Sequence, residues 1–395
     1  MADGTHNGLR MQGRTLNPEP ENRVGQEVVR SHILRAVQLV AMLRYAADKA
    51  QVKRRVIGRL PRWSAPQWPR NRAGQRFLIL TYHRVGNLRT DPWSMTVTPQ
   101  HFLEHLEVLR QYAHPVTLER LSRGFVEGDL PDRSVAVTFD DAYADSLYGA
   151  KPLLERYEIP ATVFVATEYI GHTLGFWWDE LDRLLLQPGA LPEEFYLRIN
   201  KNQYRWKLGK TDRHSGDTSR QLPLWRVGWD DSMFRYYLCH SLAELLRPLT
   251  EGERRKVLNE LLAWASAEPG VQPGHRILSL EEVVTLAQAD LIEVGAHTMT
   301  HPMLSLLPQA SQRHEIVGSK TRLEEILGQR VNKFAYPFGV PAKDTVGILR
   351  EAGVTCACLL AQKYVNPLIN RFQLPRVAAE DWSGEKFARW LLQFK

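Results

Sequence analysis

The chain has 395 residues, 44% hydrophobic and 24% charged, which is the composition of a soluble globular protein and excludes a disordered or fibrous one. This length allows one large α/β domain with insertions or two ordinary domains. The net charge of +7 is unevenly spread. Residues 1–76 hold fifteen Lys and Arg against five Asp and Glu, a balance of +10, so the remainder of the chain sums to −3.

The first 75 residues are expected to form a basic N-terminal extension that is partly helical or disordered. Residues 33–47 are apolar but include Arg35 and Arg44, and they fall short of the roughly 20 residues that a membrane-spanning helix needs. Neither a secretory signal nor a transmembrane span is evident. We therefore expect a cytoplasmic protein whose extension is solvated, docks on the main domain, or makes peripheral contact with the anionic inner face of the membrane.

From residue 76 onward, apolar β-rich runs alternate with segments of helical period, and this alternation predicts βαβ units and a parallel sheet. Before residue 171 the expected strands lie at 76–85, 134–143 and 160–167, and the expected helices at 98–112 and 144–158. After residue 276 the expected helices lie at 279–288, 309–328 and 344–353, and the expected strands within 291–301, 333–339 and 355–361. Thr98 followed by Pro99 is a typical helix start.

The alternation breaks at about 171–276, which we interpret as an insertion into a main domain at 76–395. Its predicted elements are a Trp-rich helix at 175–187, a hairpin within 196–220, and helices at 233–246 and 251–265. The insertion is expected to act as a lid or as an acceptor-binding lobe, although simple packing would also explain it. The three cysteines, Cys239, Cys356 and Cys358, are expected to be buried apolar residues.

Two motifs at predicted strand ends suggest a metal site, because parallel α/β folds place their sites at the carboxyl ends of strands. In "VTFDDAY", Asp140 and Asp141 directly follow a strand, where neighbouring charges raise each other's pKa unless something neutralises them. His297 and His301 lie four residues apart in "GAHTMTH", and two imidazoles with one carboxylate are a common ligand set for a catalytic divalent metal. We predict that Asp141, His297 and His301 bind such a metal. Asp140 then stays free to take a proton from a water molecule that the metal acidifies.

A third strand end carries "YPFG" at 336–339, a stiff turn that can present a backbone N–H toward a reacting oxygen. Each motif alone is common in surface turns and ordinary cores. Their conjunction, each at a predicted strand end and in this order, is much more specific.

These residues resemble the polysaccharide deacetylase family, carbohydrate esterase family 4, over about 76–395. The family motif T-F-D-D matches residues 138–141, and the motif H-[ST]-x-x-H matches residues 297–301. The motif R-x-P-[FY]-G is matched in part by "AYPFG", and "LTYHRV" near residue 80 is similar to the first strand of one branch of the family.

The resemblance implies a distorted (β/α) barrel that hydrolyses an N-acetyl group on an amino sugar with the help of a divalent metal ion, most often Zn²⁺. It implies that Asp140 is the general base and that the metal ligands are Asp141, His297 and His301. It further implies that Thr298 braces the histidine loop and that the backbone N–H of Phe338 completes the oxyanion hole.

The sequence departs from the family pattern at two places. The arginine of the third motif is Ala335 here, and Arg376 in "QLPRV" is a candidate to supply that charge from a later strand; otherwise it is a structural arginine. The family's general acid comes from a C-terminal L-x-H motif, but no histidine follows His314. His83 in "TYHRV" is the candidate substitute, and otherwise a hydrogen-bonded core histidine.

We therefore expect a metal-dependent N-deacetylase of surface-polysaccharide biosynthesis, acting on an amino sugar in a glycan, a glycolipid or a nucleotide sugar. A deformylase or another amide hydrolase would use the same site, and the two departures also suit a catalytically weak or inactive carbohydrate-binding homologue. Nucleic acid is not an expected partner, because the N-terminal charges lack interleaved stacking aromatics or a recognised module.

Overall fold

The computed structural model describes residues 74–187, 189–199, 202–207, 231–341, 344–360 and 370–393. The expected basic extension at 1–75, except for its last two residues, lies outside these ranges. So does the second half of the expected hairpin segment at 196–220, from residue 208 onward.

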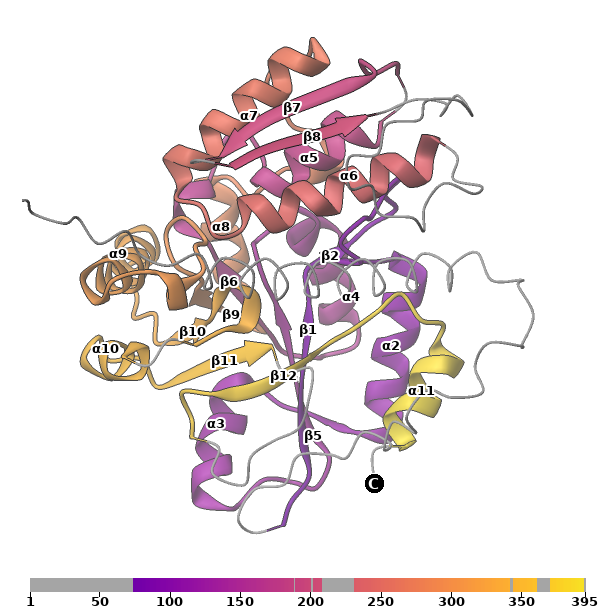
Figure 1. Ribbon diagram of the computed structural model, residues 1–395. Coiled ribbons are helices and arrows are strands. Elements are labelled where there is room, and N and C mark those ends of the chain that lie inside the picture. Colours follow the sequence, from indigo (N-terminus) through magenta and orange to yellow (C-terminus); the bar gives the residue numbers. More distant parts are fainter. Residues whose placement is uncertain are drawn as a thin grey trace, which may run out of the picture. The chain divides into compact units, whose positions relative to one another are not determined.

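The predicted (β/α) barrel is confirmed: seven parallel strands close on themselves, because β1 (Phe77–Tyr82) pairs both with β12 (Leu374–Ala378) and with β5 (Ser134–Phe139) (Figure 1). In order around the barrel they are β1 (Phe77–Tyr82), β12 (Leu374–Ala378), β11 (Cys356–Leu360), β10 (Lys333–Ala335), β9 (Ile292–Ala296), β6 (Ala161–Val165) and β5 (Ser134–Phe139). A regular barrel of this class has eight strands, so the seven described here make a distorted one. β4 (His114–Pro115) pairs with the start of β5, and β2 (Arg84–Val85) pairs with β3 (Thr96–Val97).

Helices cover the outside of the barrel, which is why its strands read as continuous apolar runs. They are α2 (Pro99–Tyr112), α3 (Leu118–Glu127), α4 (Lys151–Arg156) with a preceding π-helical turn (Ser146–Ala150), α8 (Leu280–Ala287), α9 (Gln309–Leu327), α10 (Thr345–Glu351) and α11 (Gly384–Gln393). Thr98 caps α2 by accepting a hydrogen bond from the backbone N–H of His101, and Pro99 stands at the first helical position, as predicted. No helix in the described part of the chain is both long enough and apolar enough to cross a membrane.

The amino end of the barrel is closed by α3, which lies at the opposite end from α5 and α6 in Figure 1. Leu118 and Leu121 of α3 pack in one buried cluster with Phe77 and other side chains of the barrel strands. Gly295 belongs to the same interior, because a Cβ atom there would lie 2.5 Å from the Phe164 ring. Apolar side chains therefore fill the interior of the barrel at this end.

A second buried core holds the elements that follow residue 171. They are α5 (Trp177–Leu185), the antiparallel hairpin of β7 (Glu194–Ile199) and β8 (Asn202–Lys207), α6 (Asp231–Leu246) and α7 (Glu251–Ala265). The side chains at the centre of this core are Trp177, Leu181, Phe195, Trp206, Leu242 and Leu258. The predicted helices and hairpin are thus present, while the domain boundaries at about 171 and 276 stay a prediction.

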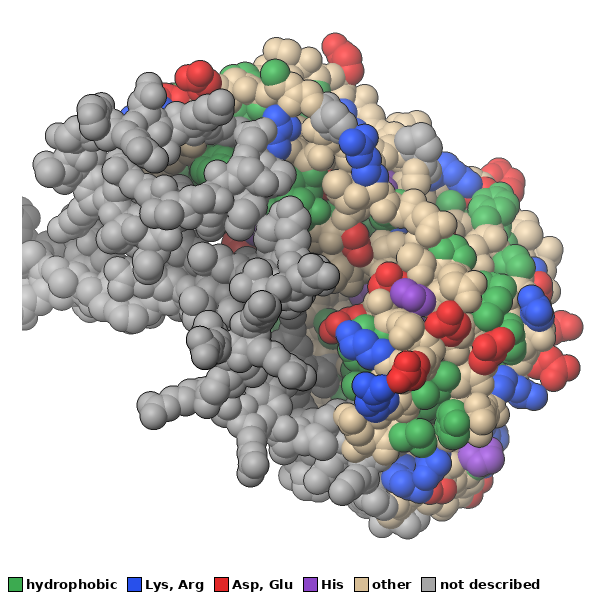
Figure 2. Space-filling view, turned by 90° about the vertical axis from the view of Figure 1, so that its right-hand side faces the viewer, with side chains coloured by type: hydrophobic (Ala, Val, Ile, Leu, Met, Phe, Trp, Pro, Cys, Tyr) green, Lys and Arg blue, Asp and Glu red, His purple; other side chains and the backbone are tan. Residues whose placement is uncertain are grey.

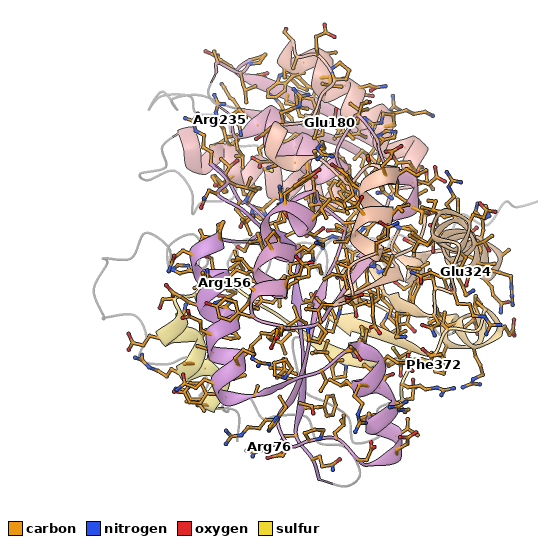
Figure 3. All side chains as sticks on the ribbon, turned by 180° about the vertical axis from the view of Figure 1, so that it is seen from behind. Arg76, Arg156, Glu180, Arg235, Glu324 and Phe372 are labelled. Carbon is orange, nitrogen blue, oxygen red and sulfur yellow. The ribbon has the colours of Figure 1, made fainter. Side chains whose placement is uncertain are left out.

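Charged side chains form ion pairs both in the second core and at the amino end of the barrel. Glu180, labelled among the helices of the second core in Figure 3, pairs with Arg255 at 3.0 Å although its side chain is buried. Arg76, at the far end of the barrel in the same view, pairs with Asp132. On the face that Figure 2 shows, the described acidic and basic side chains are interspersed with apolar ones. All three cysteines are free and buried, as expected.

Candidate active site

The loop after β5 carries the two neighbouring aspartates at the carboxyl end of the barrel. Successive residues of a strand point to opposite faces, so the backbone has to turn for both carboxylates to serve one site. It does so at Asp141 and Ala142, whose φ angles are +69° and +56°. The left-handed conformation costs on the order of 1–2 kcal/mol for such residues, and it persists only where the surroundings impose it.

The loop after β9 brings the two histidines to the same place. Thr298 and His301 also adopt left-handed conformations, with φ angles of +68° and +52°. The Thr298 hydroxyl accepts a hydrogen bond from the backbone N–H of His301 at 3.1 Å and donates one to the carbonyl of His297. Glu315 of α9 accepts hydrogen bonds from both the backbone N–H and the hydroxyl of Thr300. The histidine loop is therefore braced from within and from the neighbouring helix.

Asp141, His297 and His301 form a group of three buried ligand atoms within 4.8 Å of one another. Asp141 Oδ1 lies 3.7 Å from His297 Nε2 and 3.4 Å from His301 Nε2. Ligand atoms about 2.1 Å from a tetrahedral Zn²⁺ would lie about 3.4 Å apart, so the spacing suits such an ion. His297 Nδ1 lies 2.8 Å from the carbonyl oxygen of Ala335, a contact that assigns the proton to Nδ1 and leaves Nε2 free to bind a metal.

Two further properties of this group fit a cation. Asp141 Oδ1 is fully buried and has no hydrogen-bond partner in the described residues, which is costly for a carboxylate oxygen. Burial, and next the charge of Asp140, raise the pKa of Asp141 well above its usual value. Burial also lowers the pKa values of His297 and His301. A divalent cation among these atoms would favour the ionised carboxylate and the neutral imidazoles.

Arg376 of β12 holds the other aspartate. Its Nη1 and Nη2 donate hydrogen bonds of 2.7 and 2.6 Å to the two carboxylate oxygens of Asp140, and Nη1 also contacts the Thr138 hydroxyl at 3.1 Å. Arg376 is 1% exposed and Asp140 5% exposed. Burial is the largest single influence and would raise the pKa of Asp140, but the charge of Arg376, the charge of His297 and the hydrogen bonds from Arg376 together outweigh it, and the net pKa lies well below the usual range. Asp140 is therefore ionised although it is buried.

His83 and Phe338, the remaining candidates, lie beside this group. His83 follows β1 at the carboxyl end of the barrel; desolvation lowers its pKa, and the nearby charge of Asp140 opposes this shift. Phe338 has a φ angle of +56°, in the short helical turn Pro337–Gly339, and its ring centroid lies 4.8 Å from that of His301. All seven residues singled out in the sequence as catalytic or metal-binding candidates thus belong to one end of the barrel.

The start of α5 supplies aromatic residues that sequence reasoning did not connect with the site. The rings of Phe176 and Trp178 stack at 4.4 Å between centroids, and that of Trp178 lies 5.0 Å from the His301 ring at an angle of 65°. The cue was the Trp-rich run, which indicated a helix but not what it faces.

Sequence reasoning also missed a buried polar cluster beside the aspartate loop. Tyr143 donates a hydrogen bond of 2.9 Å to Asp179 Oδ2, and His275 Nδ1 lies 3.2 Å from Asp179 Oδ1. All three residues are at most 3% exposed. The available signal was Asp179 directly after the aromatic residues of the run 175–187, which also contains Glu180 and Asp182.

Comparison with known proteins gives a match to the family model described as polysaccharide deacetylase, over residues 127–189 and 267–357. The poly-beta-1,6-N-acetyl-D-glucosamine N-deacetylase of Staphylococcus epidermidis is 33% identical over 111 residues. That alignment covers 24% of this chain and 38% of the relative, so the chain spans less than half the length of this curated protein.

Two solved structures are similar in backbone. The deacetylase PplD of Streptococcus pyogenes, in complex with acetate, is 16% identical with a TM-score of 0.49, and IcaB of Ammonifex degensii is 19% identical with the same TM-score. Each likeness covers 80% of this chain and 97% of the other. The family model matches segments that contain both the Asp140–Asp141 pair and the His297–His301 loop, and the chain thus belongs to the polysaccharide deacetylase family.

Proposed function

We propose that this chain is a metal-dependent hydrolase that removes the N-acetyl group from an amino sugar, in a glycan, a glycolipid or a nucleotide sugar of surface-polysaccharide biosynthesis. One observation carries the proposal: buried ligand atoms of Asp141, His297 and His301 lie within 4.8 Å of one another, beside an Asp140 carboxylate that Arg376 binds through both oxygens. Arg376 holds the pKa of Asp140 low, whereas burial and Asp140 hold the pKa of Asp141 high. Environments that separate the pKa values of neighbouring groups are typical of sites in which each group has its own task.

In this proposal the metal ligands are Asp141, His297 and His301. A divalent ion held there, most suitably Zn²⁺, would acidify a water molecule and polarise the acetamide carbonyl. The unpartnered oxygen of Asp141 and the two Nε2 atoms are the donors that such an ion uses.

Asp140 is proposed to take the proton from the attacking water. Arg376 keeps it ionised and fixes both of its oxygens through two hydrogen bonds, so the base enters the reaction already oriented. Its low pKa makes it a weak base, which suits a water molecule that is itself strongly acidified.

Two further groups complete the proposed chemistry. The backbone N–H of Phe338 would hold the oxygen that gains charge as the carbonyl is attacked. His83 would carry a proton to the departing amine of the sugar, the task of a general acid. His83 belongs to the same end of the barrel as Asp140, whose charge acts on its pKa.

The name of the Staphylococcus epidermidis relative supports an N-acetylglucosamine polymer as the substrate class. A mass-spectrometric screen for loss of one acetyl group, over free, nucleotide-linked, lipid-linked and polymeric N-acetyl amino sugars, tests the proposal. Wild-type protein should release acetate, chelation should stop the release, and Asp140→Asn should lower the rate by about 10²–10⁴-fold. An N-formyl sugar in the same screen identifies a deformylase. Metal binding without turnover of any substrate would instead indicate an inactive carbohydrate-binding homologue.

The proposed location is the cytoplasm, with peripheral contact at the inner membrane face through the basic residues 1–75. Cell fractionation of the full-length chain and of a chain lacking these residues tests this. Equal release of both proteins into the soluble fraction would contradict the membrane contact.

A further inference from the structure

The loop that carries Asp141 contacts both ends of the insertion. These ends, which we call its roots, are residues 176–179 at its start and residues 274–278 at its end. Tyr143 lies two residues after Asp141 and is completely buried. It packs in the core cluster of α5, α6 and α7 rather than in that of the barrel strands. The aspartate loop therefore places one side chain, that of Tyr143, in the core of the insertion, while Ala142 and Ala144 pack in the core of the barrel.

The hydroxyl of Tyr143 connects two residues of α5. It donates a hydrogen bond of 2.9 Å to Asp179 Oδ2 and accepts one of 2.9 Å from Trp178 Nε1. Asp179 Oδ2 also accepts a hydrogen bond from the backbone N–H of Phe176 at 3.3 Å. This last contact stabilises the first turn of α5, but helix capping does not account for the buried bond to Tyr143.

The second root holds the same loop through its backbone. Ala144 N donates to the carbonyl of Arg276 at 2.8 Å, and Leu278 N donates to the carbonyl of Ala142 at 3.1 Å. An isolated antiparallel bridge joins Tyr143 to Ile277. These bonds lie at Ala142 and in the two residues that follow it, and they support the left-handed backbone of Asp141 and Ala142.

The Tyr143 ring is also fixed on its face. The guanidinium of Arg84 lies 4.2 Å from the ring centroid and pairs with Asp145 at 3.1 Å, and it also donates to the carbonyl of Gly274. Arg84 is 1% exposed. The Tyr143 side chain is thus held directly by Arg84 and by α5, and Arg84 is itself held by Asp145 and by the carbonyl of Gly274.

We propose that Asp179 and Tyr143 are positioning residues that set where the Asp141 carboxylate stands, so that the root of the insertion determines the metal affinity of the site. This inference rests on the metal site of the proposed function. It assigns the insertion a task inside the site in addition to any contact with substrate. Partners that orient metal ligands change metal affinity by about 10–100-fold when they are replaced, and we expect that range here.

The experiment measures the affinity of the full-length chain for Zn²⁺ by competition with a chromophoric chelator, together with melting temperature and circular dichroism. Tyr143→Phe removes only the hydroxyl, and Asp179→Asn keeps the shape of the side chain but removes its charge. Each should weaken Zn²⁺ binding by about 10–100-fold. The double variant should lose no more than the worse single one, because both changes break one linkage.

The matched control is Tyr82→Phe. Tyr82 is also buried, and its hydroxyl contacts His105 Nδ1 of α2 at 3.2 Å, so the change leaves the hydrogen bond from Asp140 N to the Tyr82 carbonyl in place. The Tyr82→Phe variant should melt at a lower temperature than the wild type but bind Zn²⁺ with the same affinity. The inference is overturned if the Tyr143 and Asp179 variants melt lower but also bind Zn²⁺ as the wild type does. If the wild-type chain binds no divalent ion, the proposed function itself is wrong, and this inference fails with it.

Discussion

Replacing Arg376 with methionine removes the positive partner of Asp140 and keeps a side chain of similar length. The change is informative because the pair is bidentate, with side chains only 1% and 7% exposed. Methionine fills much of the space without offering a hydrogen bond. Any change in stability then comes from the Asp140 carboxylate, which has lost its partner.

The expected loss of stability follows from that carboxylate. Removing one partner of a buried ion pair costs about 3–5 kcal/mol, since it leaves an uncompensated charge. In the wild type the folded-state pKa of Asp140 is depressed, so its contribution is present above the unfolded value of about 3.9 and is lost only as the pH falls below it. In the variant, burial dominates and raises the folded-state pKa above that value. The destabilisation should therefore grow as pH rises, by on the order of 1–3 kcal/mol between pH 5 and pH 7.5.

Urea unfolding followed by tryptophan fluorescence at these two pH values measures the effect, on chelator-treated protein so that no cation acts on Asp140. Arg313→Met is the control, because Arg313 pairs with Glu351 on the surface with side chains 48% and 61% exposed, and such pairs contribute little. A loss below about 1 kcal/mol for the Arg376 variant, or a loss that is the same at both pH values, would refute the reasoning.

Metal uptake should release a proton and strengthen as pH rises through the raised pKa of Asp141, because the ion displaces the proton that the buried carboxyl holds; calorimetric titrations that give equal heats in buffers of different ionisation enthalpy would argue against this. Gly295→Ala should destabilise the barrel by about 1–3 kcal/mol, because the new Cβ meets the Phe164 ring at 2.5 Å; thermal melts against Gly252→Ala, on the open surface of α7, check it. His83→Gln should lower kcat by about 10²–10⁴-fold while the metal content measured by mass spectrometry is kept, and loss of metal would place His83 among the ligands instead.

Local patterns in the sequence were enough for most of the fold. β1 and β5 are apolar runs that pair along all six of their residues, and Ser279 with Glu282 forms the expected helix start of α8. The helix α3 was not predicted. Its ten residues include several polar ones, so its apolar pattern is weak. It packs against barrel strands that are distant in the sequence, and a short sequence window does not contain those partners.

The site was predictable where its residues are neighbours in sequence. Asp140 with Asp141, and His297 with His301, are short motifs, so their types and spacing are visible directly. The contact of Arg376 with Asp140 is different, because it requires that β12 lie one strand away from β5, with β1 between them. That adjacency arises from barrel closure. The bond between Tyr143 and Asp179 likewise joins a loop to a helix 36 residues later, and the sequence carries no periodicity that links them.

The neighbouring strands β6 and β9 have a consequence for how the chain folds. Residues Val165 and Ile292 bound a stretch of 126 residues that must be traversed before these strands meet. Relative to a crossover of about 30 residues, closing so long a loop costs about 1.3 kcal/mol more in chain entropy. Prior collapse of the intervening helices around their own core would shorten that search. We therefore expect the last strands to join late during refolding, after the intervening segment has become compact.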